Sequence, residues 1–522
     1  MLVAIPQRIV TDVIYTIRRI SMNRSNCIVA QSGGPTVAIN SSLAGVISGI
    51  ANSTEYNICY GAVNGILGIL NEDYLNLSEI FSDEESIEKL KTTPAMYLGS
   101  CRHKLPDYKD DDSPYVFIFH QFEKLNIKAF FYIGGNDSMD TVLKLSDYAS
   151  KIKSDIRIIG IPKTIDNDLC MTDHTPGFGS AAKYVASSLL EIAHDTFIYA
   201  VKSVTIVEIM GRDAGWLTAA AALARNDYNT APHFIYLPEV DFDPVKFISD
   251  IKEALSKTNN VIVAVSEGIH DASGAYVTSS EASNDQFGHQ QLSGAGKALE
   301  FLVKEHIGVK VRSVEINVLQ RCAAHLASLT DITESFEQGN KGVELASSGI
   351  TGSMVCIKRT SNAPYTIEYS YSPISEIANE AKSIPREWIN DDGNDINPEL
   401  IEYLRPLIQG DEQTADFINC VVFGRGAEFA ERYLHQGTKI VATGRIQTGS
   451  YTNKDGNRVY TTDVVVEEQE FAESKAAASE NAGGGYQQAG AAAPTRPEPT
   501  QAAGDGFMNI PDAIEEELPF KC

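Results

Sequence analysis

The chain has 522 residues, of which 43% are hydrophobic and 21% are charged, and its formal net charge is −26. This length allows about three domains, and the apolar fraction suffices for sizeable buried cores. The negative charge disfavours indiscriminate binding to nucleic acid or anionic lipid, so any phosphate site has to be local. The cysteines (27, 59, 101, 170, 322, 356, 420 and 522) show neither a CxxC pair nor a metal-ligand spacing. This argues against a disulfide framework and predicts a cytoplasmic location.

The N-terminal residues 1–21 lack the basic start, apolar middle and small-residue cleavage site of a secretory signal. We interpret them as an extension before a domain that starts at Met22. No apolar run reaches the ~18 residues that a membrane span requires, so we expect a soluble protein without membrane association.

Short apolar runs alternate with turns and helical stretches from residue 26 onward. Such runs lie at residues 27–30, 129–133, 157–161 and 261–265, and each precedes a turn rich in glycine or charge. Continuous apolar runs of this length are typical of buried parallel strands. The sequence therefore predicts the α/β class, with two sheets that share a cleft.

Two glycine turns offer backbone amides to an anion. Gly33-Gly34 follows the first apolar run and precedes a helical stretch, whose N-terminus favours negative charge. A plain tight turn is the alternative interpretation of this pair. Gly134-Gly135 repeats the arrangement and adds Asp137, a carboxylate that a purely structural turn does not require.

Two carboxylates follow the third apolar run. Asp166 and Asp168 lie two residues apart, which suits a general base beside a metal-linked partner. Lys163 supplies a charge for a phosphate oxygen, and a solvated acidic loop is the alternative. After another β-like run at residues 204–209, Arg212 offers a planar donor for a phosphate or a sugar. A surface arginine is the alternative there.

These turns, in this order, resemble the phosphofructokinases over residues 22–410. Residues 98–102, 266–268 and 312–321 add further family elements. The resemblance implies two Rossmann-like lobes with a cleft between them, and phosphoryl transfer to the 1-hydroxyl of fructose 6-phosphate. It also implies Asp166 as the base and a Mg²⁺ site that includes Asp168.

The resemblance implies a role for each further matched residue. Arg312 would reach across a subunit contact, which implies a homo-oligomer. The sugar would be contacted by Thr164, Ile165, Asp166, Met210, Gly211 and Arg212, with Glu267 and Arg321 at its hydroxyls and 6-phosphate. The phosphoryl donor would face Gly34, Arg102, Asp137 and Lys163, of which Lys163 would also act in catalysis.

Two positions decide which donor we expect. ATP-using members of the family carry glycine where this chain has Asp137 and Lys163. The carboxylate opposes the α-phosphate of a nucleotide by its bulk and charge, while the lysine suits the terminal phosphate of a compact donor. We therefore expect pyrophosphate in a reversible glycolytic reaction without nucleotide control, and ATP is the alternative donor.

Two further positions depart from the family pattern. Asn136 stands where many relatives have an aspartate that touches magnesium, so this metal ligand is expected to be a neutral amide. Val318 stands where relatives commonly offer a polar or aromatic side chain to the sugar. That contact is therefore expected to be absent.

A β-rich module follows at residues 411–474. On residues 416–419, 421–425, 444–448 and 460–462 it resembles the later part of the bacterial single-stranded-DNA-binding protein, an OB-fold. The resemblance implies Phe417, Phe423 and Tyr451 as rings that stack on bases. The segment lacks the opening strands, and its eleven acidic residues outnumber six basic ones. Both features speak against DNA binding by this incomplete OB-like segment, and single-stranded DNA is kept as an alternative partner only.

The C-terminal residues have a different composition. Residues 475–505 are rich in alanine, glycine, glutamine and proline, which predicts a disordered linker. Residues 506–522 form an acidic tail that resembles the partner-docking tail of the DNA-binding family. In that family a terminal phenylalanine carboxylate matters, whereas here Lys521 and Cys522 follow Phe520.

Two interpretations compete with that of an enzyme. One is a DNA-binding or repair-partner protein with a passenger kinase domain, and the other is a regulatory subunit without catalysis. The kinase-like part retains its motifs, whereas the DNA-binding part lacks about half of its barrel, so the enzyme is favoured. The junction in the middle of a fold suggests fused or mis-joined reading frames. Asp166 and Lys163 are both present, which disfavours a regulatory subunit.

Overall fold

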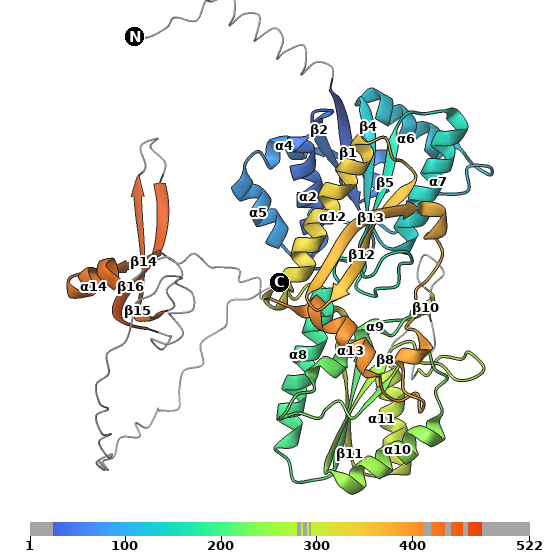
Figure 1. Cartoon of the computed structure of the whole chain (residues 1–522), viewed down its shortest axis with the longest axis vertical. Coiled ribbons are helices and arrows are strands. Elements are labelled where there is room, and N and C mark those ends of the chain that lie inside the picture. Colours follow the sequence, from blue (N-terminus) through green and yellow to red (C-terminus); the bar gives the residue numbers. More distant parts are fainter. Residues whose placement is uncertain are drawn as a thin grey trace, which may run out of the picture. The chain divides into compact units, whose positions relative to one another are not determined.

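The computed structural model describes residues 24–278, 283–284, 290–291, 294–410, 419–433, 440–452 and 458–471. The chain divides into two compact units, Met1–Ala415 and Asp416–Cys522, and each is described by itself (Figure 1). The predictions for residues 1–21, 475–505 and 506–522 lie outside the described residues, as does Phe417. None of the helices in the described ranges has the length and apolar character of a membrane span.

The first lobe of the larger unit is built on a seven-stranded sheet. Its strands are β1 Ser25–Gln31, β2 Tyr56–Ala62, β3 Tyr74–Asn76, β4 Ile127–Gly134, β5 Arg157–Pro162, β12 Ser353–Asn362 and β13 Tyr365–Pro373. Their order is β13-β12-β5-β4-β1-β2-β3, with antiparallel pairing only at the two edge strands. The predicted apolar runs form β1, β4 and β5, which are buried along most of their length.

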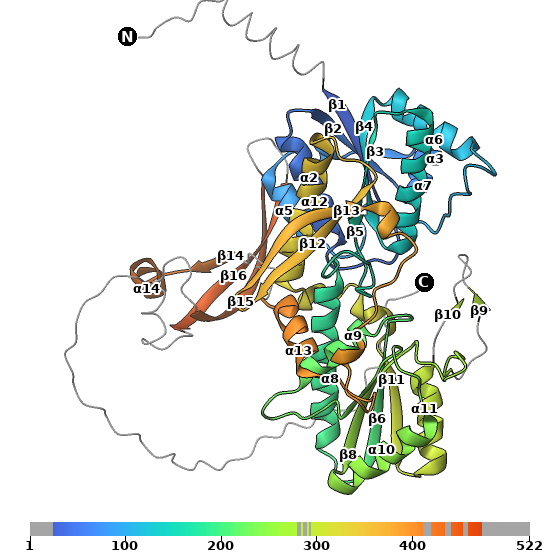
Figure 2. The ribbon, with the colours of Figure 1, turned by 45° about the vertical axis from the view of Figure 1, so that its right-hand side comes forward.

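Helices cover both faces of this sheet. α2 Ile39–Asn52 and α12 Leu329–Ser347 lie side by side on one face (Figure 2). A Cβ atom on Gly45 of α2 would lie 1.9 Å from the Phe336 carbonyl oxygen of α12, so glycine permits this close approach. α6 Ser113–Lys124 and α7 Asn136–Ile152 pack on the other face. Shorter helices are α3 Ile66–Leu70, α4 Leu77–Ile80 and α5 Glu84–Thr92.

The second lobe is built on a four-stranded parallel sheet. Its strands are β6 Ser203–Ile209, β7 Phe234–Tyr236, β8 Asn260–Ser266 and β11 Lys310–Glu315, in the order β11-β6-β8-β7. α8 Phe178–Phe197 and α9 Trp216–Ala220 pack on one face, and α10 Pro244–Lys257 and α11 Ala295–His306 pack on the other. The predicted α/β class with two sheets is thus confirmed.

The last part of the larger unit, residues 374–410, packs against both lobes. Ile374 and Ile377 belong to the core of the first lobe, whereas Leu400 and Leu404 of α13 Pro398–Leu404 belong to that of the second. The remaining elements are the short strands β9 Ser283–Asn284 and β10 Gln290–Gln291, and the 3-10 helices η1 Ala221–Ala224, η2 Asn317–Gln320, η3 Ala324–Leu326, η4 Ile374–Glu376, η5 Arg386–Trp388 and η6 Arg405–Ile408.

The smaller unit contains a three-stranded sheet in its described residues. β15 Ile440–Thr452 and β16 Arg458–Phe471 pair antiparallel, and β14 Asn419–Val422 pairs parallel with β16. One helix, α14 Arg425–Tyr433, follows β14. This small sheet is consistent with the predicted OB-like segment.

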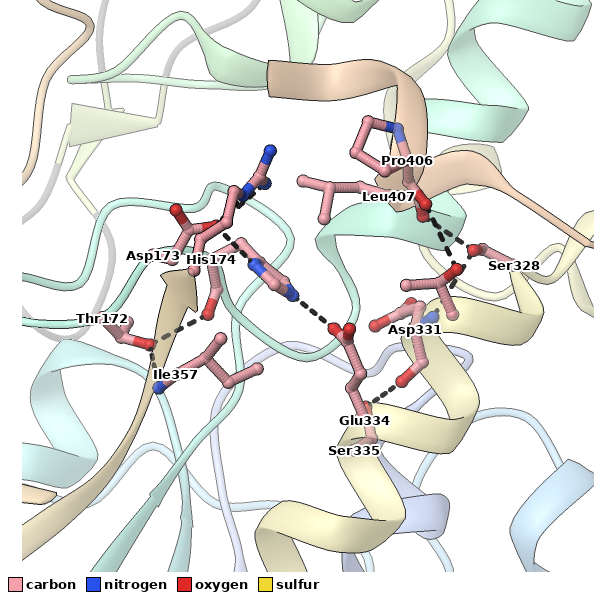
Figure 3. Close-up of polar contacts among 12 residues, drawn as sticks. Thr172, Asp173, His174, Ser328, Asp331, Glu334, Ser335, Ile357, Pro406 and Leu407 are labelled. Carbon is pink, nitrogen blue, oxygen red and sulfur yellow. Dashed lines mark hydrogen bonds and ion pairs between the residues drawn. The ribbon is translucent and has the colours of Figure 1, made fainter. Parts of the chain in front are cut away.

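A buried ionic cluster lies where the loop before α8 meets α12 (Figure 3). His174 lies between two carboxylates, with Nδ1 2.8 Å from Asp173 Oδ2 and Nε2 2.5 Å from Glu334 Oε2. Arg359 of β12 donates to Asp173, and the Tyr365 hydroxyl donates to Glu334. Burial disfavours the charged imidazole, but the Glu334 and Asp173 carboxylates outweigh burial and raise the pKa of His174 to about 9.

We expect His174→Gln to destabilise the protein more at about pH 6.5 than at about pH 9.5. The folded pKa lies above the ordinary value of 6.5, so the stabilising charge is fully present below about pH 6.5 and is lost as the pH rises through about 9. The loss of unfolding free energy caused by the substitution should be about 3 kcal/mol smaller at pH 9.5 than at pH 6.5. Chemical denaturation of both proteins at each pH measures this difference.

The exposed His194 of α8 provides a matched control. His194→Gln, measured in the same way, removes a histidine without removing any contact of the buried cluster. If His174→Gln acted equally at both pH values, the charged state of His174 would be ruled out.

Candidate functional site

The predicted site segments lie at the carboxyl ends of strands. Residues 33–34 follow β1 and residues 163–168 follow β5, while residues 134–137 run from the last residue of β4 into the start of α7. In the second lobe, residues 210–212 follow β6 and residues 266–268 follow β8. Since β1, β4 and β5 are parallel neighbours, their three turns meet at one edge of the sheet.

Lys163 connects the third turn to the first. Its side chain is buried, and its Nζ donates a hydrogen bond to the Gly34 carbonyl oxygen at 2.7 Å. Burial lowers the pKa of Lys163 to about 8, against the opposing charge of Asp166. A Cβ atom on Gly33, whose φ is +82°, would lie 3.1 Å from this Nζ. The ammonium group therefore lies directly at the first glycine turn.

Asp166 is a partly buried carboxylate among cations. Burial raises its pKa, and the charges of Arg321, Lys163 and Arg212 oppose this effect. Its backbone N–H donates to Thr164 Oγ1 at 3.1 Å, which holds the start of the loop. A carboxylate with a raised pKa in such a place is suited to accept a proton from a substrate hydroxyl.

Asp168 is the second carboxylate of the loop. Burial, and then the neighbouring Asp166, raise its pKa, so a cation bound here would relieve the repulsion. The described residues contain no group of three or more His, Cys, Asp or Glu side chains able to hold a metal ion. Mg²⁺ characteristically takes one or two carboxylates and fills its shell with water and substrate phosphates. Asp168 fits that pattern.

Asn136 engages both ends of its amide with a distant segment. Its Oδ1 accepts from the Asn379 N–H at 2.9 Å, and its Nδ2 donates to the Glu380 carbonyl oxygen at 3.0 Å. One lone pair of Oδ1 is left for another partner. A metal-ligand role for Asn136 stays a prediction, and its observed role is to attach this segment to the second glycine turn.

Asn167 is a site residue that the motifs do not identify. It lies between the two aspartates, is fully buried and has a positive φ of 56°. Its Nδ2 donates to the Tyr403 hydroxyl at 2.9 Å. Asparagine tolerates the left-handed conformation better than most residues. The asparagine between the two aspartates was therefore the sequence signal for a left-handed turn at this position.

The sugar-side residues of the second lobe form one compact group. The Gly211 N–H donates to Glu267 Oε1 at 3.3 Å, and Gly211 has a φ of +135°. Burial raises the pKa of Glu267 to about 7, opposed by the Gly211 amide. Arg212 Nε is buried and without a hydrogen-bond partner among the described residues, so it can bind a substrate oxygen. Met210 and Ile165 complete this part of the predicted set, partly buried and buried respectively.

The predicted donor-side residues surround the first two turns. A Cβ atom on Gly34 would lie 3.7 Å from the Arg321 guanidinium carbon, so Arg321 reaches the donor turn as well as Asp166. Arg102 and Asp137 are exposed. The predicted roles of all these residues stay predictions.

Arg312 lies apart from the other predicted residues of this chain. It is on β11, opposite Thr205 of β6, and its Nη2 donates to Asp195 Oδ2 at 2.7 Å and Thr196 Oγ1 at 2.9 Å. The end of β6 that bears Met210 is further along the strand. Its role across a subunit contact stays a prediction. Val318 is exposed.

In the smaller unit, the candidate stacking rings are only partly described. Phe423 follows β14. Its side chain is 70% exposed, and exposure is what a base-stacking ring requires. Tyr451 lies on β15. Base stacking by Phe417, Phe423 and Tyr451 stays a prediction.

Known families match both parts of the chain. The family model described as Phosphofructokinase matches residues 26–346, and that described as Single-strand binding protein family matches residues 402–472. The chain is 40% identical over 394 residues to a pyrophosphate--fructose 6-phosphate 1-phosphotransferase of Halomonas elongata, covering 75% of this chain and 93% of that protein. It is 41% identical over 394 residues to the protein of that name from Rhodospirillum rubrum, covering 74% and 95%.

Solved structures with similar names also match this chain. The crystal structure of a pyrophosphate-dependent phosphofructokinase from Nitrosospira multiformis matches with a TM-score of 0.67 and 36% identity, covering 74% of this chain and 93% of that one. The corresponding Marinobacter aquaeolei structure has a TM-score of 0.66 and 35% identity, with coverages of 74% and 92%. Because the chain is 40 to 41% identical to these bacterial relatives and covers 93 to 95% of their length, the chain belongs to the phosphofructokinase family.

Proposed function

We propose that this chain transfers a phosphoryl group from pyrophosphate to the 1-hydroxyl of fructose 6-phosphate, giving fructose 1,6-bisphosphate and phosphate. The observation that carries the choice of donor is the buried Lys163 ammonium at the Gly34 carbonyl oxygen. A cation at this turn favours a compact polyphosphate, and Asp137 at the start of α7 disfavours a nucleotide. The names of the bacterial relatives at about 40% identity support the same donor.

In the proposed reaction, each step falls to a group of this chain. The sugar 1-hydroxyl oxygen attacks the terminal phosphorus, the bridging P–O bond breaks, and phosphate leaves. The hydroxyl proton passes to the Asp166 carboxylate, which Arg212 and Arg321 keep in an electropositive environment. Phosphoryl transfer depends mainly on positioning and charge stabilisation, which these arginines and Lys163 provide.

A bound Mg²⁺ would neutralise charge on the phosphate oxygens. Asp168, beside Asp166 in the same loop, would hold it. We further propose that the enzyme works reversibly in glycolysis, in the cytoplasm, and as a homo-oligomer in which Arg312 serves a neighbouring subunit. The edge position of β11 in its sheet leaves Arg312 at a border where a second copy can pack.

Asp166→Ala should lower kcat by roughly 10²- to 10⁴-fold, because the general base is lost. Circular dichroism should show an intact fold. Asp155→Ala is the control, since Asp155 is an exposed carboxylate of the same lobe that pairs with Lys128. It should leave kcat unchanged, and near-normal turnover by Asp166→Ala would remove Asp166 as the base.

The double variant Lys163→Gly with Asp137→Gly should lose at least about tenfold in kcat/KM for pyrophosphate and gain measurable turnover with ATP. The reason is that the compact cationic site is replaced by space for a nucleotide. Steady-state rates with each donor and fructose 6-phosphate measure both effects. A wild-type enzyme that uses ATP and ignores pyrophosphate would overturn the proposed donor.

A chain ending after Ala415 should keep kcat within about twofold of the full chain, since all the residues assigned to the reaction lie in the larger unit. A large loss would assign the smaller unit a part in catalysis. Single-stranded DNA binding is the second candidate function, favoured by the family match at residues 402–472. Fluorescence anisotropy of a labelled oligothymidine with the full and shortened chains tests it, and binding that needs residues beyond 415 would support it.

A further inference from the structure

A short strap, residues 379–384, touches the donor side of the site. The Asn379 N–H and the Glu380 carbonyl oxygen bond to the Asn136 amide at 2.9 and 3.0 Å. Asn379 Nδ2 also donates to Asp140 of α7 at 3.4 Å. Asn379 has a φ of 66°, a left-handed turn that directs the strap along the site loops. The strap is therefore attached at the start of α7, directly after the second glycine turn.

Lys382 of the strap contacts the loop that carries the two carboxylates. Its backbone N–H donates to the Asp168 carbonyl oxygen at 2.7 Å. Its Nζ donates to the Asp173 carbonyl oxygen at 2.7 Å, the Thr172 carbonyl oxygen at 3.1 Å and Asn167 Oδ1 at 3.4 Å. One side chain thus spans both ends of the loop segment from residue 167 to residue 173.

The same residue is bonded to the sugar-side loop of the second lobe. Trp216 Nε1 donates to the Lys382 carbonyl oxygen at 2.9 Å, and the Lys382 ammonium lies 5.0 Å from the centre of the Trp216 ring. Two residues further, the Ile384 N–H donates to Glu239, which also accepts from the Gly215 N–H. Gly215 ends the turn that begins at Arg212, and Trp216 is the first residue of α9.

The energetics make this connection specific to lysine. An ammonium group has three donors, and three acceptors face this one. An apolar side chain of the same length would remove the lysine donor of the Thr172 carbonyl oxygen and leave the Asp173 carbonyl oxygen with only the Tyr403 hydroxyl.

We propose that Lys382 is a positioning residue, which fixes the distance between the Asp166–Asp168 loop and the Arg212 loop. It acts through the backbone of Asp168 and the indole of Trp216 and touches no substrate. The proposal rests on the proposed function, because it concerns the spacing of the base from the sugar-binding arginine. A displacement of these groups by a fraction of an ångström lowers the rate of transfer more than it lowers substrate binding.

The test compares full-length Lys382→Met with wild type in assays with fructose 6-phosphate, Mg²⁺ and pyrophosphate. The assay temperature lies well below the Tm of each protein. We expect kcat to fall at least about tenfold while both KM values change less than about threefold. The chain has two tryptophans, Trp216 and Trp388, whose rings lie 6.2 Å apart near Lys382. Their fluorescence emission should therefore shift in this variant.

Lys183→Met is the matched control for loss of a structural lysine. Its Nζ donates to the Ala327 and Gly410 carbonyl oxygens at 3.1 and 2.8 Å, and neither partner belongs to the carboxylate loop. This variant should keep kcat, KM and tryptophan emission. An equal fall in kcat in both lysine variants, or normal kcat in Lys382→Met, would overturn the positioning role.

A second variant decides the matter if Lys382→Met does not fold. Trp216→Phe keeps an aromatic ring and removes the N–H that bonds the Lys382 carbonyl oxygen. It should lower kcat at least about threefold with KM unchanged, whereas Trp388→Phe, in the same aromatic group, should not. Normal kcat in Trp216→Phe would overturn the inference. Absence of turnover by wild type with either donor would instead overturn the proposed function.

Discussion

The burial of three charges in one loop is the constraint on which the rest of the site depends. Lys163, Asp166 and Asp168 lie within six residues of sequence. Burial lowers the pKa of the lysine and raises the pKa of both aspartates, which favours the neutral form of each group. Charges removed from water are retained only where partners replace the lost hydration. The Gly34 carbonyl oxygen and the Arg321 guanidinium supply part of this replacement.

The two-lobed fold provides these partners from distant parts of the chain. Parallel strands bring the turns of the first lobe to one edge, and β6 and β8 present the sugar-side turns of the second. Neither lobe alone contains the complete set, since Asp166 belongs to one and Arg212 to the other. The strap at residues 379–384 bonds to both lobes. It lies between β13 and α13 in the sequence.

Much of this site was predictable because its candidate residues lie in short sequence motifs, each directly after an apolar run. The apolar runs became β1, β4, β5 and β8, and the glycine and carboxylate turns followed them as expected. The strap was not predictable, since Lys382 bonds mainly to backbone carbonyl oxygens 209 and 210 positions away, which leave no residue signature. The same holds for Asn136, whose motif indicated a metal and whose amide meets Asn379 and Glu380.

The late position of the strap has a consequence for biosynthesis. During translation the first sheet can begin to form once β5 has left the ribosome, but the carboxylate loop then lacks Lys382 and Tyr403, and β12 with Arg359 is also still to come. Domains generally fold as units when their chain is complete. The carboxylate loop can therefore take its final form only after the strap and α13 have been synthesised.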